Sequence, residues 1–522
     1  MTNWTARPDV FPDGFASLSS KLGWQVQGHN SASSEYTSTP YFTQRPYFRP
    51  YFTPNAPYFT PTTPYFNRHL WRWARRLCLA EEIAHTRIAC HAAGYWDMHT
   101  GYAKQNGGTY EFLLDAKTGY AVPTEQRFWD DLMSNATAWG LRVYEQDWLD
   151  DEFDRCAPLT QSATLARQWL GQMARGAAKS GITIQYCMSH VRHILASVEL
   201  LSVTQARASG DYHPGAATPG HDQWSPIGTT GILAYALGLA PSKDNYWSTT
   251  DQPDNKHYHD HPREPYNRLQ AAVSTVSKGP VAPSDKVGHS DVALILRSCM
   301  EDGTLLAAGR PATKLDAFLL AEAAVADDGG GHHAASSATR SSVSTGEVWS
   351  AESQVSGRTF AVVFAARVSA PYTLSPKELG YAEGTPLVAT EANASTADGV
   401  TRYIRLEVNG GGGLHLAAND MFDFALWNVA AVDAASGWAL LGEVRHKWVG
   451  VSPARVTAIA TGAGPHGSMA ATVRGAPNES IELAFAPPAS ATHDGPLVAK
   501  VVKCVLPATG VATLRVPEAT CE

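Results

Sequence analysis

The chain has 522 residues, of which 44% are hydrophobic and 17% charged. This balance is typical of a folded protein and excludes a disordered chain, and the length predicts more than one domain. The net charge is −8 without a long basic stripe, which argues against a nucleic-acid partner.

The first distinctive segment is TPYFTQRPYFRPYFTPNAPYFTPTTPYFNR, residues 39–68, in which Pro-Tyr-Phe recurs five times. Proline fixes φ and removes backbone donors, so the run cannot form a helix or an inner strand. We interpret it as a low-complexity insertion at about 31–95, although its aromatic repeats could also bind a partner. The start of the chain, MTNWTARPDVFPDGF, lacks the layout of a signal peptide. No apolar run is long enough for a membrane span, and we predict none. The location stays unknown; a chain truncated at its N-terminus would be compatible with a secreted or organellar protein.

From about residue 103 the pattern alternates between helix and strand. Predicted helices are PTEQRFWDDLMSNATAWG, SATLARQWLGQMARGAAKSG, VRHILASVELL, SPIGTTGILAYALGL and NRLQAAVSTVSKG, and predicted strands are LRVYEQDWL, ITIQYCMS, SVTQARASGD and GPVAPSD. Such alternation indicates a parallel βα architecture, for which a (β/α)8 TIM barrel is the natural closure. We assign residues 1–320 to this α/β barrel.

The pattern changes after residue 320. AEAAVADDGGGHHAASSATRSS is rich in small residues, so we predict a linker at 321–340. Short strand-like segments separated by turn residues then predict a β-sandwich over 341–522.

Two acids stand at predicted strand ends of the barrel. Asp147 ends LRVYEQDWL and Asp211 ends SVTQARASGD, 64 residues later, which is about two repeats of a barrel with about 30 residues per unit. Both carboxylates would then face one mouth, as glycoside transfer requires. The alternative for Asp211 is an ordinary turn residue, because Gly210 and Pro214 accompany it.

Several ordered motifs resemble raffinose synthases and alkaline α-galactosidases of glycoside hydrolase family 36. They are QYCMSHVRHILASVELLSVTQARASGDYHPG, TGILAYALGLAPSKDNYWST, KGPVAPSDKVG and EDGTLLAAGRPATKLDAFL. The resemblance covers roughly residues 100–365 and more weakly the remainder. It implies a TIM barrel followed by a β-sandwich, no cofactor, and a retaining reaction on a glycoside. It makes Asp147 the nucleophile, and Asp211, the second acid of an Arg-x-Ser-Asp-Asp-Phe motif, the acid/base.

The resemblance also implies substrate contacts. Arg207 could bind a sugar or pair with an acid; Asp244 and Asp285 could bind hydroxyls or serve as turn or helix-capping residues. Trp148 could stack on a sugar or fill the top of the barrel.

The chain departs from the family at three places. Glu145 stands where the family has a lysine, which alters the set of hydroxyls that can be bound, and Gly210 replaces the first of the paired acids. The N-terminal sandwich and the first barrel strand have no counterpart before WTARPDVFPDG. We therefore expect either a retaining glycoside hydrolase or transglycosylase for terminal, α-galactoside-like sugars, or a catalytically degenerate carbohydrate-binding protein on the same fold.

Metal chemistry has no support in the sequence. The seven cysteines form no CxxC pair, and the histidines of KHYHDHPRE and GGGHHAAS lack ordered ligand spacing, so we predict no metal site.

Overall fold

The structure is a computed structural model. It describes the backbone of two strands, 26–30 and 88–92, and then residues 110–115, 117–118, 121–137, 141–216, 222–253, 263–286, 288–327, 345–392, 400–406, 412–463, 467–489 and 497–522. The Pro-Tyr-Phe run, 39–68, lies outside the described residues. So does most of the predicted insertion, but its residues 88–92 form a strand.

The N-terminal half contains a six-stranded parallel sheet. Its order is β2 (Ile88–Ala92), β1 (Val26–Asn30), β5 (Leu141–Gln146), β6 (Thr183–Tyr186), β7 (Val203–Arg207) and β8 (Ala240–Ser242). The predicted strands LRVYEQDWL, ITIQYCMS and SVTQARASGD are confirmed as β5, β6 and β7, and all neighbours run parallel. The parallel βα sheet is therefore confirmed, whereas its closure into an eight-stranded barrel stays a prediction.

The predicted strand GPVAPSD is wrong. Within this described stretch, Pro283 makes an isolated parallel bridge to Tyr246. Pro280 and Pro283 have no N–H to donate to a neighbouring strand, which explains why no continuous strand forms.

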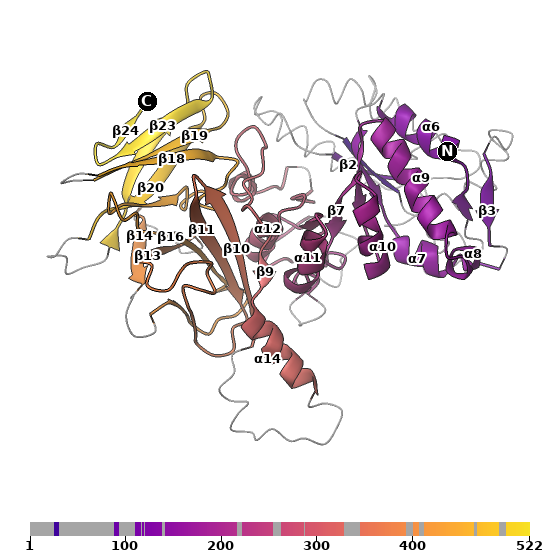
Figure 1. The fold of residues 1–522 in the computed structure, drawn as a ribbon, viewed down its shortest axis with the longest axis horizontal. Coiled ribbons are helices and arrows are strands. Elements are labelled where there is room, and N and C mark those ends of the chain that lie inside the picture. Colours follow the sequence, from indigo (N-terminus) through magenta and orange to yellow (C-terminus); the bar gives the residue numbers. More distant parts are fainter. Residues whose placement is uncertain are drawn as a thin grey trace.

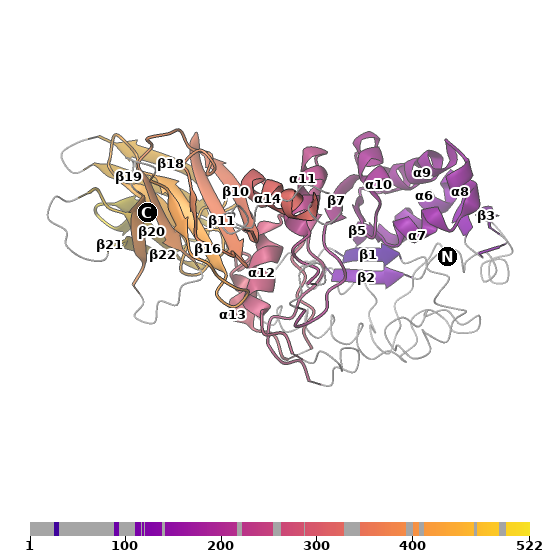
Figure 2. The same ribbon diagram turned by 90° about the horizontal axis from the view of Figure 1, so that it is seen from below.

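Helices cover one face of the sheet (Figure 2). In α6 (Gln126–Thr137) the buried residues Phe128, Trp129, Leu132, Met133 and Ala136 form one helical stripe. Helix α9 (Leu165–Lys179) packs beside it. Gly176 permits this approach, because a Cβ there would lie 2.9 Å from the Trp129 backbone. The other N-terminal elements are β3 (Phe112–Leu114), β4 (Ala121–Pro123), α7 (Leu149–Asp154), α8 (Ala157–Gln161), α10 (Val191–Ala196), a 3-10 turn (Ser197–Glu199), α11 (Ile227–Ala236), α12 (Asn267–Val276) and α13 (Val292–Leu296).

The C-terminal half is built of antiparallel strands in layers (Figure 1). The main sheet has the order β21 (Leu497–Val498), β14 (Arg402–Leu406), β13 (Leu387–Glu391), β16 (Ala425–Ala431), β11 (Arg358–Ala366), β10 (Glu347–Val355) and β9 (Thr313–Lys314). The facing layer consists of β17 (Ala439–Gly442), β20 (Ser480–Ala486) and β22 (Lys500–Val505), and of β18 (Val456–Gly462), β19 (Ser468–Arg474), β23 (Val511–Val516) and β24 (Thr520–Cys521). A shared apolar core joins the two layers, as in a β-sandwich. A disulfide joins Cys504 to Cys521.

The other face of the main sheet packs against a small two-stranded sheet and a helix. The small antiparallel sheet is β12 (Tyr372–Leu374) with β15 (Leu414–Leu416), and the helix is α14 (Asp316–Asp327). Helix α14 occupies the first seven residues of the predicted linker, 321–340, and the remainder of that linker lies outside the described residues.

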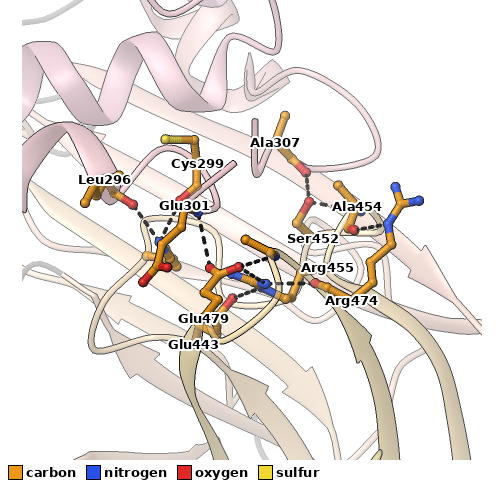
Figure 3. Close-up of polar contacts among 12 residues, drawn as sticks. Leu296, Cys299, Glu301, Ala307, Glu443, Ser452, Ala454, Arg455, Arg474 and Glu479 are labelled. Carbon is orange, nitrogen blue, oxygen red and sulfur yellow. Dashed lines mark hydrogen bonds and ion pairs between the residues drawn. The ribbon is translucent and has the colours of Figure 1, made fainter. Parts of the chain in front are cut away.

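A buried ionic cluster fastens the two halves together (Figure 3). Arg455 Nε lies 2.7 Å from Glu443 Oε2, and its other guanidinium nitrogens contact Glu479. Lys447 Nζ donates to the carbonyls of Leu296 and Cys299 at 2.7 and 2.6 Å. Glu479 Oε1 also accepts the Glu301 N–H at 3.4 Å, so the cluster holds the C-terminal end of α13 and the residues after it.

This cluster predicts a large effect of one substitution. Arg455→Met should leave two buried carboxylates without their cation, which costs about 3–5 kcal/mol. Calorimetry should show a lower Tm. Arg515→Met, at an exposed ion pair with Glu522, is the matched control and should cost under about 1 kcal/mol. Equal Tm values for the two variants would contradict this role of the cluster.

Candidate active site at the carboxyl ends of the parallel strands

Polar side chains gather where four neighbouring strands end. Asp147 follows β5, Cys187 follows β6, Arg207 is the last residue of β7, and Lys243 and Asp244 follow β8. Because the strands are parallel, these residues share one edge of the sheet. Ligands of open and barrel-shaped α/β sheets bind at this edge.

A second polar row lies one layer deeper. Glu145 pairs in register with Gln185, and Gln185 with Gln205. Gln185 Nε2 donates to Glu145 Oε1 at 3.3 Å. Side chains alternate between the faces of a strand, so Glu145 shares the face of Asp147, whereas Tyr144 packs in the helix-covered core. Glu145 therefore lies on the same side of the sheet as Asp147, two residues deeper, and is partly exposed.

Arg207 is the centre of the upper row. Its side chain is 10% exposed, and Nη1 lies 2.7 Å from Asp211 Oδ1 and 3.9 Å from Asp244 Oδ1. Burial works against this charge, yet the neighbouring carboxylates of Asp244, Asp211 and Asp147 hold the pKa of Arg207 well above its ordinary value. One buried cation thus pairs with Asp211, lies near Asp244, and is stabilised in its charged form by Asp147 as well.

Asp147 is fixed by its immediate neighbours. It is 6% exposed, and its Oδ1 accepts the N–H of Trp148 at 2.9 Å. Trp148 has a φ of 58°, a left-handed conformation that costs energy for a large side chain and recurs at functional sites. The chain therefore turns sharply after Asp147. Burial, together with a hydrogen bond to Asp147, raises the pKa of the Cys187 thiol, which keeps this neighbour protonated.

Asp211 is held differently from the expectation. The predicted strand SVTQARASGD ends at Arg207, because Ser209 and Gly210 lead the chain out of the sheet, so Asp211 lies in the loop. Its side chain is 55% exposed. The Arg207 ion pair directs it back towards the strand ends.

The residue after Asp211 anchors this loop. The Tyr212 N–H donates to Asp244 Oδ2 at 2.8 Å, and its hydroxyl donates to Glu264 at 2.7 Å. Asp244 thus binds the loop and faces Arg207, so the structure gives this carboxylate protein partners on both sides.

Sequence reasoning missed Tyr212, Glu264 and Lys243. Lys243 is buried, donates to the Asn245 carbonyl and lies 4.7 Å from the centre of the Tyr212 ring. Burial lowers the pKa of Lys243 to about 8. The position of Lys243, between the end of β8 and Asp244, could have identified it as a site residue from the sequence. Glu264 has no such signal, because only the fold brings it to Tyr212.

Asp285 is packed inside the protein. It is 1% exposed, and its oxygens accept the N–H and hydroxyl of Ser248 at 2.7 and 2.6 Å and the Gln252 amide at 2.9 Å. These bonds close the turn at 248–252. The predicted contact of Asp285 with a substrate hydroxyl stays a prediction.

No group of three or more His, Cys, Asp or Glu side chains in the described part of the chain is arranged to hold a metal ion. The histidines of GGGHHAAS and of KHYHDHP lie outside it. None of the helices there has the length and apolar character required to cross a membrane.

No family model and no curated protein matches the sequence. Similar solved structures include a GH27 β-L-arabinopyranosidase from Geobacillus stearothermophilus, with a TM-score of 0.38 and 13% identity over 58% of this chain and 61% of that one. An α-galactosidase from Saccharomyces cerevisiae gives 0.36 and 10% over 58% and 75%. A putative α-N-acetylgalactosaminidase from Bacillus halodurans gives 0.33 and 9% over 59% and 62%.

The chain therefore spans about 60% of the length of the two bacterial proteins. Because identity is at most 13% and no TM-score reaches 0.4, the function proposed below rests on the residues of this chain.

The buried Asp285 predicts a specific pH dependence. Burial raises its pKa from 3.8 to about 6, so between these values the folded protein binds the proton more tightly than the unfolded chain does. The stabilisation is complete below about pH 4 and is lost as the pH rises through about 6, a change of about 3 kcal/mol. Asp285→Asn should remove this component.

The measurement is the pH dependence of Tm from pH 4 to 7 for the wild type and the variant. Asp251→Asn, at an exposed ion pair with Arg263, should leave the wild-type slope unchanged. Parallel curves for the wild type and Asp285→Asn would show that Asp285 does not titrate in this range.

Proposed function

We propose that the protein is a retaining glycosidase or transglycosylase that acts on terminal, α-galactoside-like sugars. The observation that supports the proposal is the shared guanidinium at the carboxyl edge of the sheet: Asp211 pairs with Arg207, and the charge of Asp147 acts on the same group. Two carboxylates at one site are the minimum for double displacement.

In the first step Asp147 attacks the anomeric carbon. A carboxylate–sugar ester forms as the glycosidic bond breaks, and Asp211 gives its proton to the leaving oxygen. The short turn that fixes Asp147 to the Trp148 N–H holds the attacking group in place, which lowers the cost of reaching the reactive geometry.

In the second step a water or a sugar hydroxyl takes the place of the leaving group. Asp211 accepts its proton, the new oxygen attacks the anomeric carbon, and the ester bond to Asp147 breaks. In its ion pair with Arg207, Asp211 is the carboxylate that this step needs. Hydrolysis and transfer differ only in which acceptor reaches the ester.

The neighbouring residues have supporting roles in this proposal. Arg207 stabilises the acids between steps, Trp148 offers a ring beside the nucleophile, and Asp244 accepts a sugar hydroxyl in addition to the Tyr212 N–H. Glu145 contributes an acceptor at the level below, where a lysine would have contributed a donor. The hydroxyl pattern that fits is therefore expected to differ from that of an ordinary α-galactosidase.

The half-exposed position of Asp211 favours one alternative, a sugar-binding protein without turnover. The two functions separate in one assay. Dinitrophenyl glycosides need no acid for cleavage, so an enzyme with an intact Asp147 cleaves them, whereas a binding protein retains them unchanged.

Asp147→Asn and Asp211→Asn should fail in different ways. Without Asp147 no covalent intermediate forms, and turnover of every glycoside should fall about 10³-fold or more. Without Asp211, kcat/KM for phenyl glycosides should fall about 10²–10⁴-fold, while the first step with dinitrophenyl glycosides should persist. Azide should then accelerate the second step and yield a glycosyl azide of retained configuration.

Asp251→Asn serves as the control and should match the wild type in both assays. Product analysis by NMR identifies the configuration of the azide. An inverted glycosyl azide, or near-normal activity of Asp147→Asn, would exclude the double displacement. A wild type that binds dinitrophenyl glycosides without cleaving them would establish the sugar-binding alternative.

A further inference from the structure

The segment Asp222–Ser225, which leads from β7 towards α11, touches both halves of the molecule. Asp222 contacts the sandwich, and the next residue, Gln223, contacts the loop that carries Asp211. It therefore connects the candidate acid/base to residues more than a hundred positions away in the chain.

On the sandwich side the contact is a buried ion pair. Arg367, directly after β11, pairs through Nη1 with Asp222 Oδ2, and the two side chains are 16% and 0% exposed. The Arg367 guanidinium also lies 5.1 Å from the centre of the Trp224 ring. The centre of the Trp224 ring lies 5.7 Å from the ring centres of both Trp349 and Phe364 in the main sheet. The segment is thus fixed to the sandwich by charge and by apolar contact.

Within the segment, Asp222 also shapes the backbone. Its Oδ1 accepts the N–H and the hydroxyl of Ser225 at 3.2 and 2.8 Å. The residue between Asp222 and Trp224, Gln223, has a φ of 58°, a left-handed conformation that a glutamine adopts only where its surroundings hold it there. The ion pair is one of these surroundings.

On the site side, Gln223 binds the residue before Asp211. Its carbonyl accepts the Gly210 N–H at 3.2 Å. The two residues also lie close together, because a Cβ on Gly210 would be 3.3 Å from Gln223 Cγ. The path from Arg367 to Asp211 therefore consists of an ion pair, one held turn and one backbone hydrogen bond.

We propose that Arg367 is a positioning residue for the acid/base step: through Asp222 and Gln223 it holds the backbone of Gly210 so that the Asp211 carboxylate meets the leaving oxygen. This inference rests on the proposed function. Asp211 is half exposed, so little packing surrounds its side chain, and its position depends on the Arg207 ion pair and on the backbone that carries it. The β-sandwich thereby contributes to catalysis without touching the substrate.

The proposal predicts a selective loss. Arg367 acts on the loop after β7, whereas Asp147 is held by the turn after β5 and by Cys187. Arg367→Met should therefore impair proton transfer and spare nucleophilic attack. A general loss of stability would instead lower the rates of both proton transfer and nucleophilic attack.

The matched control lies at the opposite end of the same strand. Arg358, the first residue of β11, pairs with Asp433 at 2.8 Å, and these side chains are 31% and 13% exposed. Arg358→Met removes an ion pair of the same kind within the sandwich and leaves the Asp222 segment untouched.

The first experiment compares kcat/KM for phenyl and dinitrophenyl glycosides. For Arg367→Met we expect a loss of about tenfold or more with the phenyl glycoside, no change beyond about twofold with the dinitrophenyl glycoside, and no change in either for Arg358→Met. Equal losses with both substrates, or no loss with either, would overturn the proposal.

The second experiment does not depend on activity. Hydrogen exchange of the full-length protein should show faster exchange of the Gly210 amide, by about tenfold, in a peptide covering 207–216. A peptide covering 141–150 should be unchanged, as should both peptides in Arg358→Met. Because Arg367→Met leaves the Asp222 carboxylate buried alone, the double variant Asp222→Asn, Arg367→Met is measured as well and should show the same exchange.

The two experiments separate the two claims. Unchanged exchange at Gly210 in the double variant overturns the positioning role, whatever the activity. Faster exchange at Gly210 in a protein that cleaves no glycoside supports the link from Arg367 to the loop. The same result refutes the enzyme function, and it therefore refutes the role of that link in acid catalysis.

Discussion

The Arg207 guanidinium is the group around which the acidic edge of the sheet is organised. Asp147, Asp211 and Asp244 come from three different strand ends, and in the absence of a cation their mutual repulsion and partial desolvation would work against folding. Arg207 offsets both effects, and its ion pair turns the half-exposed Asp211 towards the sheet. The same arrangement leaves Asp147 buried and Asp211 half exposed to solvent. Such unlike environments are the condition for two carboxylates to take different roles.

The second half of the molecule bears on this edge through its contacts with the loops. An apolar cluster joins Tyr212 and Trp224 of the sheet half to Trp349 and Phe364 of the sandwich. Lys447 and Glu479, at the ionic cluster around Arg455, bind the backbone at the end of α13 and just after it. The β-sandwich is therefore packed against the loops that leave the strand ends, and a change in it can reach the site without altering any residue that faces a ligand.

The sequence predicted the elements whose signal is local. The predictions of helices α6 and α9 and of strands β5 to β7 were confirmed. Burial on one face of a helix, or on both faces of a strand, leaves a pattern of apolar residues in the sequence itself. The prediction of a strand at GPVAPSD was wrong, because its two prolines lack the N–H groups that a continuous strand needs. The site was predicted in part: Asp147 and Arg207 lie at strand ends, but Asp211 lies four residues beyond one. Contacts between distant segments, such as Glu264 with Tyr212 or Arg367 with Asp222, depend on tertiary packing and have no local signal.

The central claim is that Asp147 becomes covalently bonded to the sugar. The most direct measurement is peptide mapping by mass spectrometry after reaction with a fluoroglycosyl fluoride, a substrate whose electron-poor sugar slows both steps while its good leaving group restores the first. The account predicts one sugar per chain, bound to Asp147 in the peptide that contains LRVYEQDWL. A sugar ester on any other residue, or turnover of glycosides with no labelled peptide, would contradict it.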